Sequence, residues 1–399
     1  MYAGALICTI FAAGAAPVPP VPANQAPPPR RVKPDVSLIV VDVDKGSGKE
    51  NPPRGRVHLV GFRNGKQILR ETAWEGNETF LDRNAPFDFT VPDGWQALVA
   101  GRYLVTGEGG VIDLHAKKVL NTEERGEELW YDETKVTYSV KEPNRVQGRF
   151  TFEYATGTLT RIGAPFSKTE WFENLSVPAL LSPDCEKAIK WRGESELILH
   201  QRGQKPTSLG KGFTMEADRE LLRIRSEFMC LPLLWLDNAT FLTQRGNGKL
   251  VAVDLVGKVT DIATIKNVPD CTWPELFRDR SGAVIYVMGS NRYKIDVTKK
   301  TAKQSEWEGL GNGFEVSWSG DEKLGLKLRY KGKDIGQFRC DPETAQTAPG
   351  YLAICKVGAP QFLVRPQRGD IVVWSAATEE WTKVSTKWKG RTPIVGWIK

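Results

Sequence analysis

WLDNATFLTQ (235–244) and FRDRSGAVIYV (277–287) share one pattern, in which a turn with an acidic residue leads into a strand of alternating apolar residues. The acids of these turns, Asp237 and Asp279, stand 42 residues apart, and Asp321 follows after another 42. Such alternation turns one face of a strand inward and the other outward. The pattern therefore indicates an internal repeat built from short β-strands.

The same pattern recurs along most of the chain. Other copies are WYDETKVTYSV (130–140), LSPDCEKAIKW (181–191) and WSGDEKLGLKL (318–328), with a longer form in VPDGWQALVAGRYLV (91–105) and a form without the acid in KVGAPQFLVRP (356–366). A second strand and turn follow each copy, and the acids of these second turns keep a similar period. Asp254 and Asp296 are 42 residues apart, and Asp296 and Asp341 are 45 apart.

A repeat of this length predicts an all-β fold of the β-propeller kind. A unit of about 40–45 residues holds roughly four short antiparallel strands, which is the size of one propeller blade. One such sheet cannot bury both faces alone, whereas blades stacked in a ring can. Seven markers predict seven four-stranded blades. SLIVVDVD (37–44) and RVHLVGF (56–62) add part of another, which TPIVGWIK (392–399) would complete, so eight blades are the alternative.

Two kinds of motif resemble those of a known group of propellers. LSPDCEKAIKW (181–191) resembles the S-P-D-G-x-x-[IL]-x-[FYW] motif that begins a strand in TolB-type and other WD40-like propellers, with Cys185 where glycine is usual. VAVDLVGKVTDI (251–262) and YKIDVTKKT (293–301) resemble the D-x-x-[ST]-G-K hairpin of the same group. The resemblance covers roughly residues 80–390. It implies a fold and not an activity.

The N-terminal residues predict export. Residues 1–16 are apolar and small, with Ala13-Gly14-Ala15 as a cleavage pattern, and are typical of a signal peptide except that no Lys or Arg precedes the apolar run. Residues 17–35 are a proline-rich linker, because proline fixes φ and favours an extended chain. Residues 36–399 are then a single propeller domain. We expect a periplasmic, cell-surface or secreted protein without a transmembrane segment, or a cytoplasmic one if the first segment is not a signal.

Cysteine and histidine do not predict a metal site. Without the first segment an odd number of cysteines remains, with no C-x-x-C pair: Cys185, Cys230, Cys271, Cys340 and Cys355. The sequence leaves open whether Cys340 and Cys355 form a disulfide. The histidines, His58, His115 and His200, form no H-x-H or H-E-x-x-H motif. We expect no metal and no cofactor.

No motif assigns a catalytic residue, and the ligand-binding residues stay unassigned. GSGK (46–49) resembles a phosphate loop but has Val43 and Glu50 where that loop needs glycine and Ser or Thr. We interpret the repeated acids as turn residues that accept hydrogen bonds from backbone amides two residues on. Tryptophans at repeat positions are interpreted as packing between blades: Trp130, Trp235, Trp273, Trp318 and Trp374.

A repeat fold without a catalytic motif predicts a non-enzymatic binding or scaffold module. Its partner would be a protein or a polysaccharide on one face of the ring; we expect no nucleic acid, and a monomeric chain. The alternative is a glycan hydrolase or lyase whose acids come from separate blades around the channel. The formal net charge is +7 with both signs interspersed, which we interpret as a solvated, well-mixed surface. An anionic partner is the alternative. The densest basic stretch is the end of the chain: Lys383, Lys387, Lys389, Arg391 and Lys399.

Overall fold

The computed structural model divides into a segment, Met1–Lys33, and a folded unit, Pro34–Lys399. The signal-like residues 1–16 and most of the linker 17–35 lie outside the described residues. No helix in the described part is long and apolar enough to cross a membrane. The described residues are 32–44, 54–77, 96–106, 110–121, 126–141, 147–162, 171, 180–192, 196–213, 233–246, 248–266, 274–288, 291–318, 325–340, 345–357, 368–385 and 394–399.

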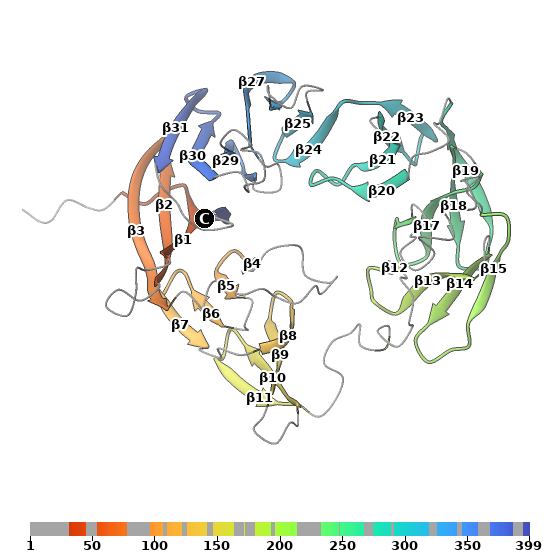
Figure 1. Ribbon diagram of the computed structural model, residues 1–399, viewed down its shortest axis with the longest axis horizontal. Coiled ribbons are helices and arrows are strands. Elements are labelled where there is room, and N and C mark those ends of the chain that lie inside the picture. Colours follow the sequence, from red (N-terminus) through yellow and green to blue (C-terminus); the bar gives the residue numbers. More distant parts are fainter. Residues whose placement is uncertain are drawn as a thin grey trace, which may run out of the picture. The chain divides into compact units, whose positions relative to one another are not determined.

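The fold is all-β, as predicted, and its described strands form eight four-stranded antiparallel sheets (Figure 1). The first sheet combines the two ends of the folded unit, in the order β3 (Lys66–Asn77), β2 (Arg54–Arg63), β1 (Val36–Asp44) and β32 (Ile394–Ile398). Each of the other sheets consists of consecutive strands in chain order. We name each sheet by its strands.

Three sheets cover the next part of the chain. Sheet β4–β7 contains β4 (Gln96–Val99), β5 (Tyr103–Thr106), β6 (Val111–Asp113) and β7 (Lys118–Asn121). Sheet β8–β11 contains β8 (Gly126–Tyr131), β9 (Lys135–Lys141), β10 (Gln147–Glu153) and β11 (Thr158–Arg161). Sheet β12–β15 contains β12 (Leu180–Leu181), β13 (Lys187–Arg192), β14 (Glu196–Gln201) and β15 (Thr207–Gly210).

Four sheets follow. Sheet β16–β19 contains β16 (Leu233–Trp235), β17 (Thr240–Gln244), β18 (Lys249–Asp254) and β19 (Val259–Thr264). Sheet β20–β23 contains β20 (Pro274–Arg278), β21 (Val284–Met288), β22 (Asn291–Asp296) and β23 (Thr301–Gln304). Sheet β24–β27 contains β24 (Trp307–Gly311), β25 (Phe314–Trp318), β26 (Leu326–Tyr330) and β27 (Lys333–Phe338). Sheet β28–β31 contains β28 (Gln346–Ala348), β29 (Tyr351–Val357), β30 (Arg368–Ser375) and β31 (Glu380–Ser385).

The preferred count of seven units is not confirmed, because the described residues form eight sheets. The two early segments and the terminal strand form a complete sheet together with β3. In this sheet β32 pairs with β1, from Ser37 opposite Ile398 to Val40 opposite Ile394. The acidic marker lies in the turn between a first and a second strand. Here those two strands are the two ends of the folded unit, so no turn joins them to carry a marker.

Two of the regularly spaced markers belong to other connections. Asp237 and Asp279 lie between the first and second strands of their sheets, as the repeat requires, but Asp321 falls between β25 and β26. Asp341 likewise falls between β27 and β28, whereas Asp296 ends a third strand. The link from β23 to β24 is short, so the first turn of sheet β24–β27 comes less than one 42-residue period after Asp279. The longer β25–β26 connection then places an acid, Asp321, at the full 42-residue spacing by compensation. The 42-residue period was thus wrong as a guide to Asp321.

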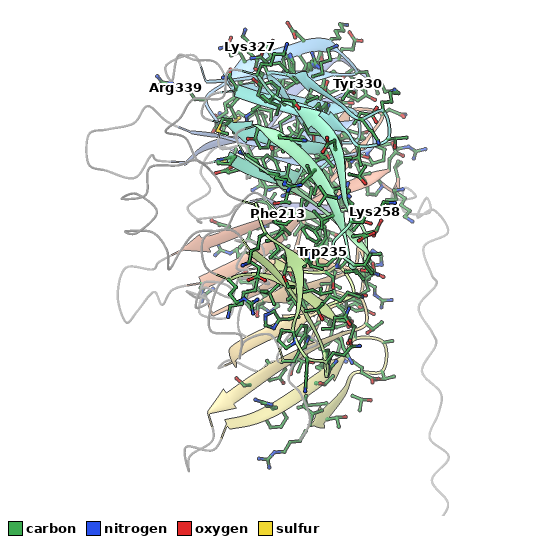
Figure 2. All side chains as sticks on the ribbon, turned by 90° about the vertical axis from the view of Figure 1, so that its right-hand side faces the viewer. Phe213, Trp235, Lys258, Lys327, Tyr330 and Arg339 are labelled. Carbon is green, nitrogen blue, oxygen red and sulfur yellow. The ribbon has the colours of Figure 1, made fainter. Side chains whose placement is uncertain are left out.

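Each sheet has a short-turn end, at which the tight connections lie. We number the strands of each sheet from one to four along the order of pairing, so that β4 and β20 are first strands and β7 and β23 are fourth strands. In the sheet formed by the two ends of the folded unit, β32 is the first strand and β3 the fourth. Because the strands are antiparallel, the turns from first to second and from third to fourth strand lie at the same end. β26 runs between the two ends, with Lys327 near one and Tyr330 at the short-turn end (Figure 2).

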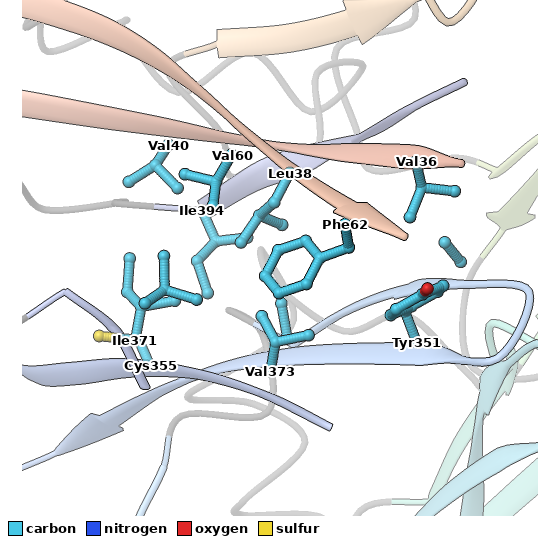
Figure 3. Packing of buried hydrophobic residues seen from close by; sticks show 13 residues of the cluster. Val36, Leu38, Val40, Val60, Phe62, Tyr351, Cys355, Ile371, Val373 and Ile394 are labelled. Carbon is cyan, nitrogen blue, oxygen red and sulfur yellow. The ribbon is translucent and has the colours of Figure 1, made fainter. Parts of the chain in front are cut away.

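Hydrophobic clusters join sheets that follow one another in the chain. Side chains of β1, β2 and β32 pack against those of β28–β30, and Phe62 lies 5.9 Å from Tyr351 between ring centroids (Figure 3). The other face of β1, with Ile39 and Val41, packs against Leu104 and Ile112 of sheet β4–β7. Further clusters join β4–β7 to β8–β11, β12–β15 to β16–β19, β16–β19 to β20–β23, and β24–β27 to β28–β31. Among the described residues, these clusters cover both faces of four of the eight sheets.

Candidate functional site

The repeated acids that the structure describes act as turn residues, as predicted, whereas Asp321 and Asp341 lie outside the described residues. Asp237 Oδ1 accepts a hydrogen bond of 2.7 Å from the backbone N–H of Ala239. Asp132 Oδ1 accepts one of the same length from the N–H of Thr134, and Asp254 Oδ1 accepts bonds from two amides of its own turn. These carboxylate oxygens are directed at the backbone, where each stabilises the bend of the chain.

Asp279 also connects two sheets. It is 5% exposed, and its Oδ1 accepts a 2.6 Å hydrogen bond from the Ser281 hydroxyl. Its Oδ2 accepts a 2.8 Å bond from the N–H of Gly309, in β24 of the next sheet. Because both oxygens are occupied in a buried position, this carboxylate has a structural role. It holds the short-turn ends of sheets β20–β23 and β24–β27 together.

The histidines lie on different sheets. His58 in β2 is buried, and its Nδ1 lies 3.2 Å from the Thr72 hydroxyl. Burial lowers the pKa of His58, and burial also lowers the pKa of His200 in β14. His115 is exposed in the turn between β6 and β7, as expected. None of the three meets another, so they do not form a shared site.

Cys340 and Cys355 lie on opposite faces of one sheet. Cys355 is buried in the cluster that faces β1 and β2. Cys340 packs on the cluster shared with sheet β24–β27, on the side of Ile354. Cys340 is the bridge partner of Lys356, and Lys356 and Cys355 point to opposite faces because they are neighbours in one strand. The sheet therefore separates the two sulfur atoms, and they form no disulfide with each other.

The predicted packing role of tryptophan holds where the side chains are described. Trp235 is 5% exposed and packs edge-on against Phe241, and Trp374 is 3% exposed beside Phe314. Trp273 lies outside the described residues, and the structure describes no side chain for Trp130 and Trp318. At the basic end of the chain, Lys383 pairs with Asp370 at 2.6 Å. Lys387, Lys389 and Arg391 are not among the described residues.

Polar groups connect sheets β20–β23 and β24–β27, whereas apolar clusters lie at six of the other junctions between consecutive sheets. Arg329 Nε donates a 2.6 Å hydrogen bond to Glu315, whose other oxygen lies 3.6 Å from Lys294 Nζ. Arg292 pairs with Glu308, and these five side chains are 21–38% exposed. Arg329 also lies 4.0 Å above the ring of Trp307. We call these five residues the charged junction; it carries three cations and two carboxylates.

Each sheet has a left-handed backbone in the turn between its third and fourth strands. Six turns have one such residue and two have a pair: Lys117, Gly157, Gly203, Gly257, Lys300 and Glu379, and the pairs Asn64–Gly65 and Lys331–Gly332, with φ from 47° to 83°. Positive φ suits glycine and is uncommon for side chains such as lysine. Lys300 and Lys331 are exposed and belong to the two sheets of the charged junction. Sequence motifs missed these residues, because a lysine in a polar turn gives no signal.

Comparisons with known proteins reach the fold only. No family model and no curated protein matches the sequence. Among solved structures, a eukaryotic initiation factor is 10% identical over 90% of this chain and 98% of its own, with a TM-score of 0.43. TolB from Acinetobacter baumannii is 11% identical over 76% of this chain and 81% of its own, with a TM-score of 0.27. A TolB is thus among the similar structures, as the motifs predicted.

The chain also matches dipeptidyl peptidase 4 from Porphyromonas gingivalis, at 10% identity over 75% of this chain and with a TM-score of 0.37. It spans about half of that protein, 52% of its length. All three TM-scores are below 0.5, so these likenesses carry no inference about function.

Proposed function

We propose that this protein is an exported, non-enzymatic binding module of the β-propeller type, which binds an acidic polymer at its short-turn end. The observation that carries the proposal is the arrangement of charge at that end. Asp254 and Asp296 each direct an oxygen at backbone amides of their own turns. The lysines of these two turns are exposed: Lys258, Lys299 and Lys300. Surface cations whose charge is not fully matched attract polyanions.

We infer that the eight sheets are the blades of one ring. Sheets that follow one another contact each other through their first strands, as β16 with β20 and β28 with β32. They also contact through fourth strands, as β19 with β23 and β3 with β31. The pairing of β32 with β1 would hold the ring closed, because it joins the two ends of the folded unit in one sheet. Export rests on the apolar residues 1–16.

Binding to a charged and an uncharged polysaccharide tests the proposal. The protein is titrated by calorimetry with alginate, a linear polyuronate, and with dextran as the neutral control. We expect binding to alginate that weakens as salt is raised, because displaced counterions favour association at low salt. The same samples are assayed for new reducing ends and for unsaturated products. Failure to bind alginate and other acidic polymers, or a depolymerising activity that one substitution abolishes, would overturn the proposal.

A further inference from the structure

We propose that two neighbouring lysine turns form the docking site for a linear uronic-acid polysaccharide. One turn joins β22 to β23 and carries Lys299 and Lys300, and the other joins β26 to β27 and carries Lys331 and Lys333. All four lysines are exposed. The inference rests on the proposed function, and adds to it a location and a chemical class of partner.

The two turns lie next to each other because the charged junction aligns their strands. Lys294 of β22 contacts Glu315, and Glu315 is the register partner of Arg329 in β26. The first turn begins three residues beyond Lys294, and the second begins two residues beyond Arg329. Since a strand advances about 3.3 Å per residue, both turns start within about 10 Å of this shared row. The junction therefore presents the two lysine pairs side by side.

The backbone conformation of Lys300 and Lys331 is a second, independent observation. Both have a left-handed backbone, with φ of 55° and 47°. Lys300 directly precedes the fourth strand, where another sheet has Gly157, and Lys331 is followed by Gly332, which is also left-handed. Glycine adopts this conformation without steric cost, whereas a lysine is strained there. Residues kept in an unfavourable conformation are more frequent at functional sites than elsewhere. The positive charge at these positions is the property that glycine would lack.

The acids around these turns leave the lysines able to bind. Lys299 lies 3.4 Å from Asp296, but the two side chains are 78% and 41% exposed. Lys333 pairs with Glu379, at 67% and 62% exposure. Exposed pairs of this kind contribute little and exchange readily for another anion. Lys117 differs, because its ammonium lies 2.7 Å from Glu71, which is only 24% exposed.

The charges elsewhere at the short-turn end favour a narrow partner. Exposed acids stand in other turns of this end, at Glu133 and Glu186. A flat anionic membrane would meet these acids together with the lysines and be repelled, while a single polysaccharide chain can follow the two lysine turns alone. Single-stranded nucleic acid would need an exposed aromatic platform. Tyr330, the aromatic residue beside the second turn, is instead packed against Phe314 and Trp374, with centroids at 4.7 and 5.1 Å.

The test compares three variants of the full chain in alginate binding. Lys300→Gly with Lys331→Gly removes two charges and relieves the strained backbone. We expect the melting temperature to stay or rise and the affinity to fall by at least about tenfold, the order expected when two cations leave an anionic surface. The matched control, Lys117→Gly with Lys118→Ala, loses the same charge in another sheet and should bind within about twofold of the wild type, since Lys117 is already paired. Lys300→Arg with Lys331→Arg keeps the charge and should keep the affinity.

The outcomes separate the site from the general function. If the wild type binds alginate and the glycine pair binds equally well, or if the control pair loses as much, the location is wrong while the proposed function stands. If the wild type binds no acidic polymer, the proposed function itself fails. Tighter binding to oligodeoxyadenylate or to phosphatidylglycerol vesicles than to alginate would overturn the class of partner assigned here.

Discussion

Tyr286 in β21 donates a 2.6 Å hydrogen bond to Gln244 Oε1 in β17, the residue that lies 42 positions earlier and in the preceding sheet. Gln244 Nε2 in turn donates to the carbonyl oxygen of Gly246 at 2.8 Å. Both side chains are buried, with Tyr286 fully enclosed. One repeat thus contacts the next through a polar pair set inside the apolar cluster between sheets β16–β19 and β20–β23.

Replacing Tyr286 by phenylalanine should destabilise the fold. The ring would still fill its space, but Gln244 Oε1 would lose its partner in a buried position. An acceptor left in this state costs about 1–3 kcal/mol. The free energy of unfolding, measured by chemical denaturation at pH 7, should fall by that order with an unchanged m-value. Wild-type stability in this variant would show that the bond contributes nothing.

Tyr154→Phe should have the opposite sign, although the substitution is the same. The Tyr154 ring is 3% exposed and stacks on Tyr103 at 4.9 Å, yet its hydroxyl has no hydrogen-bond partner among the described residues. Burial raises the pKa of this phenol, so the group stays a neutral donor without an acceptor. Removing it should leave stability unchanged or raise it by about 1 kcal/mol. The same denaturation experiment checks this, and a clear loss would show that the hydroxyl is bonded in solution.

Acid should destabilise the protein through Glu196. Hydrogen bonds from Arg192 and from the Ser208 hydroxyl, at 2.6–2.8 Å, lower the pKa of this carboxyl to about 2. A carboxyl whose pKa is lower in the folded state stabilises the fold above its unfolded pKa near 4.3. That contribution is lost as the pH falls toward 2. The melting temperature of the wild type should therefore drop more steeply from about pH 4.5 to 2 than that of Glu196→Gln.

An exposed turn acid provides the control for this pH effect. Glu133→Gln removes a carboxylate of the same chemistry at an exposed position, and its melting curve should keep the steep acid limb of the wild type. Parallel limbs for the wild type and Glu196→Gln would contradict the assignment of the acid sensitivity to the Arg192–Glu196 pair.

Sequence patterns predicted the all-β repeat and the role of its turn acids, because alternation and Asx turns are local properties. Asp237 and Asp279 show this directly, since each accepts a backbone N–H two residues on. The pairing of the terminal strand with the early segment was predicted only as part of the eight-blade alternative, because β32 and β1 come from opposite ends of the folded unit and no turn acid marks their connection. The prediction that Asp321 lies between a first and a second strand was wrong, because a short connection and a long one compensate in length. The repeat period alone cannot reveal such compensation.

The candidate site was not predictable in the same way. Lys300 and Lys331 gain their meaning from a left-handed backbone and from neighbouring strands that the charged junction aligns. Local preference places glycine or asparagine at such a position, so propensity gives no reason to single out a lysine. The presence of lysine at a left-handed turn position, where glycine is preferred, is visible only when the eight turns are compared in three dimensions.

Cys185→Gly tests the same conformational argument away from the proposed site. Cys185 stands where the resembled motif has glycine, and its φ is 59°, in a turn closed by its own N–H bonding to the Ser182 carbonyl at 2.8 Å. A side chain in this conformation costs about 1–2 kcal/mol, partly offset by the greater freedom that glycine has in the unfolded chain. Cys185→Gly should therefore raise the free energy of unfolding by about 0.5–1 kcal/mol. Cys185→Ser keeps the side chain at positive φ and should show no gain, so equal stability of the two variants would mean that the turn is not strained in solution.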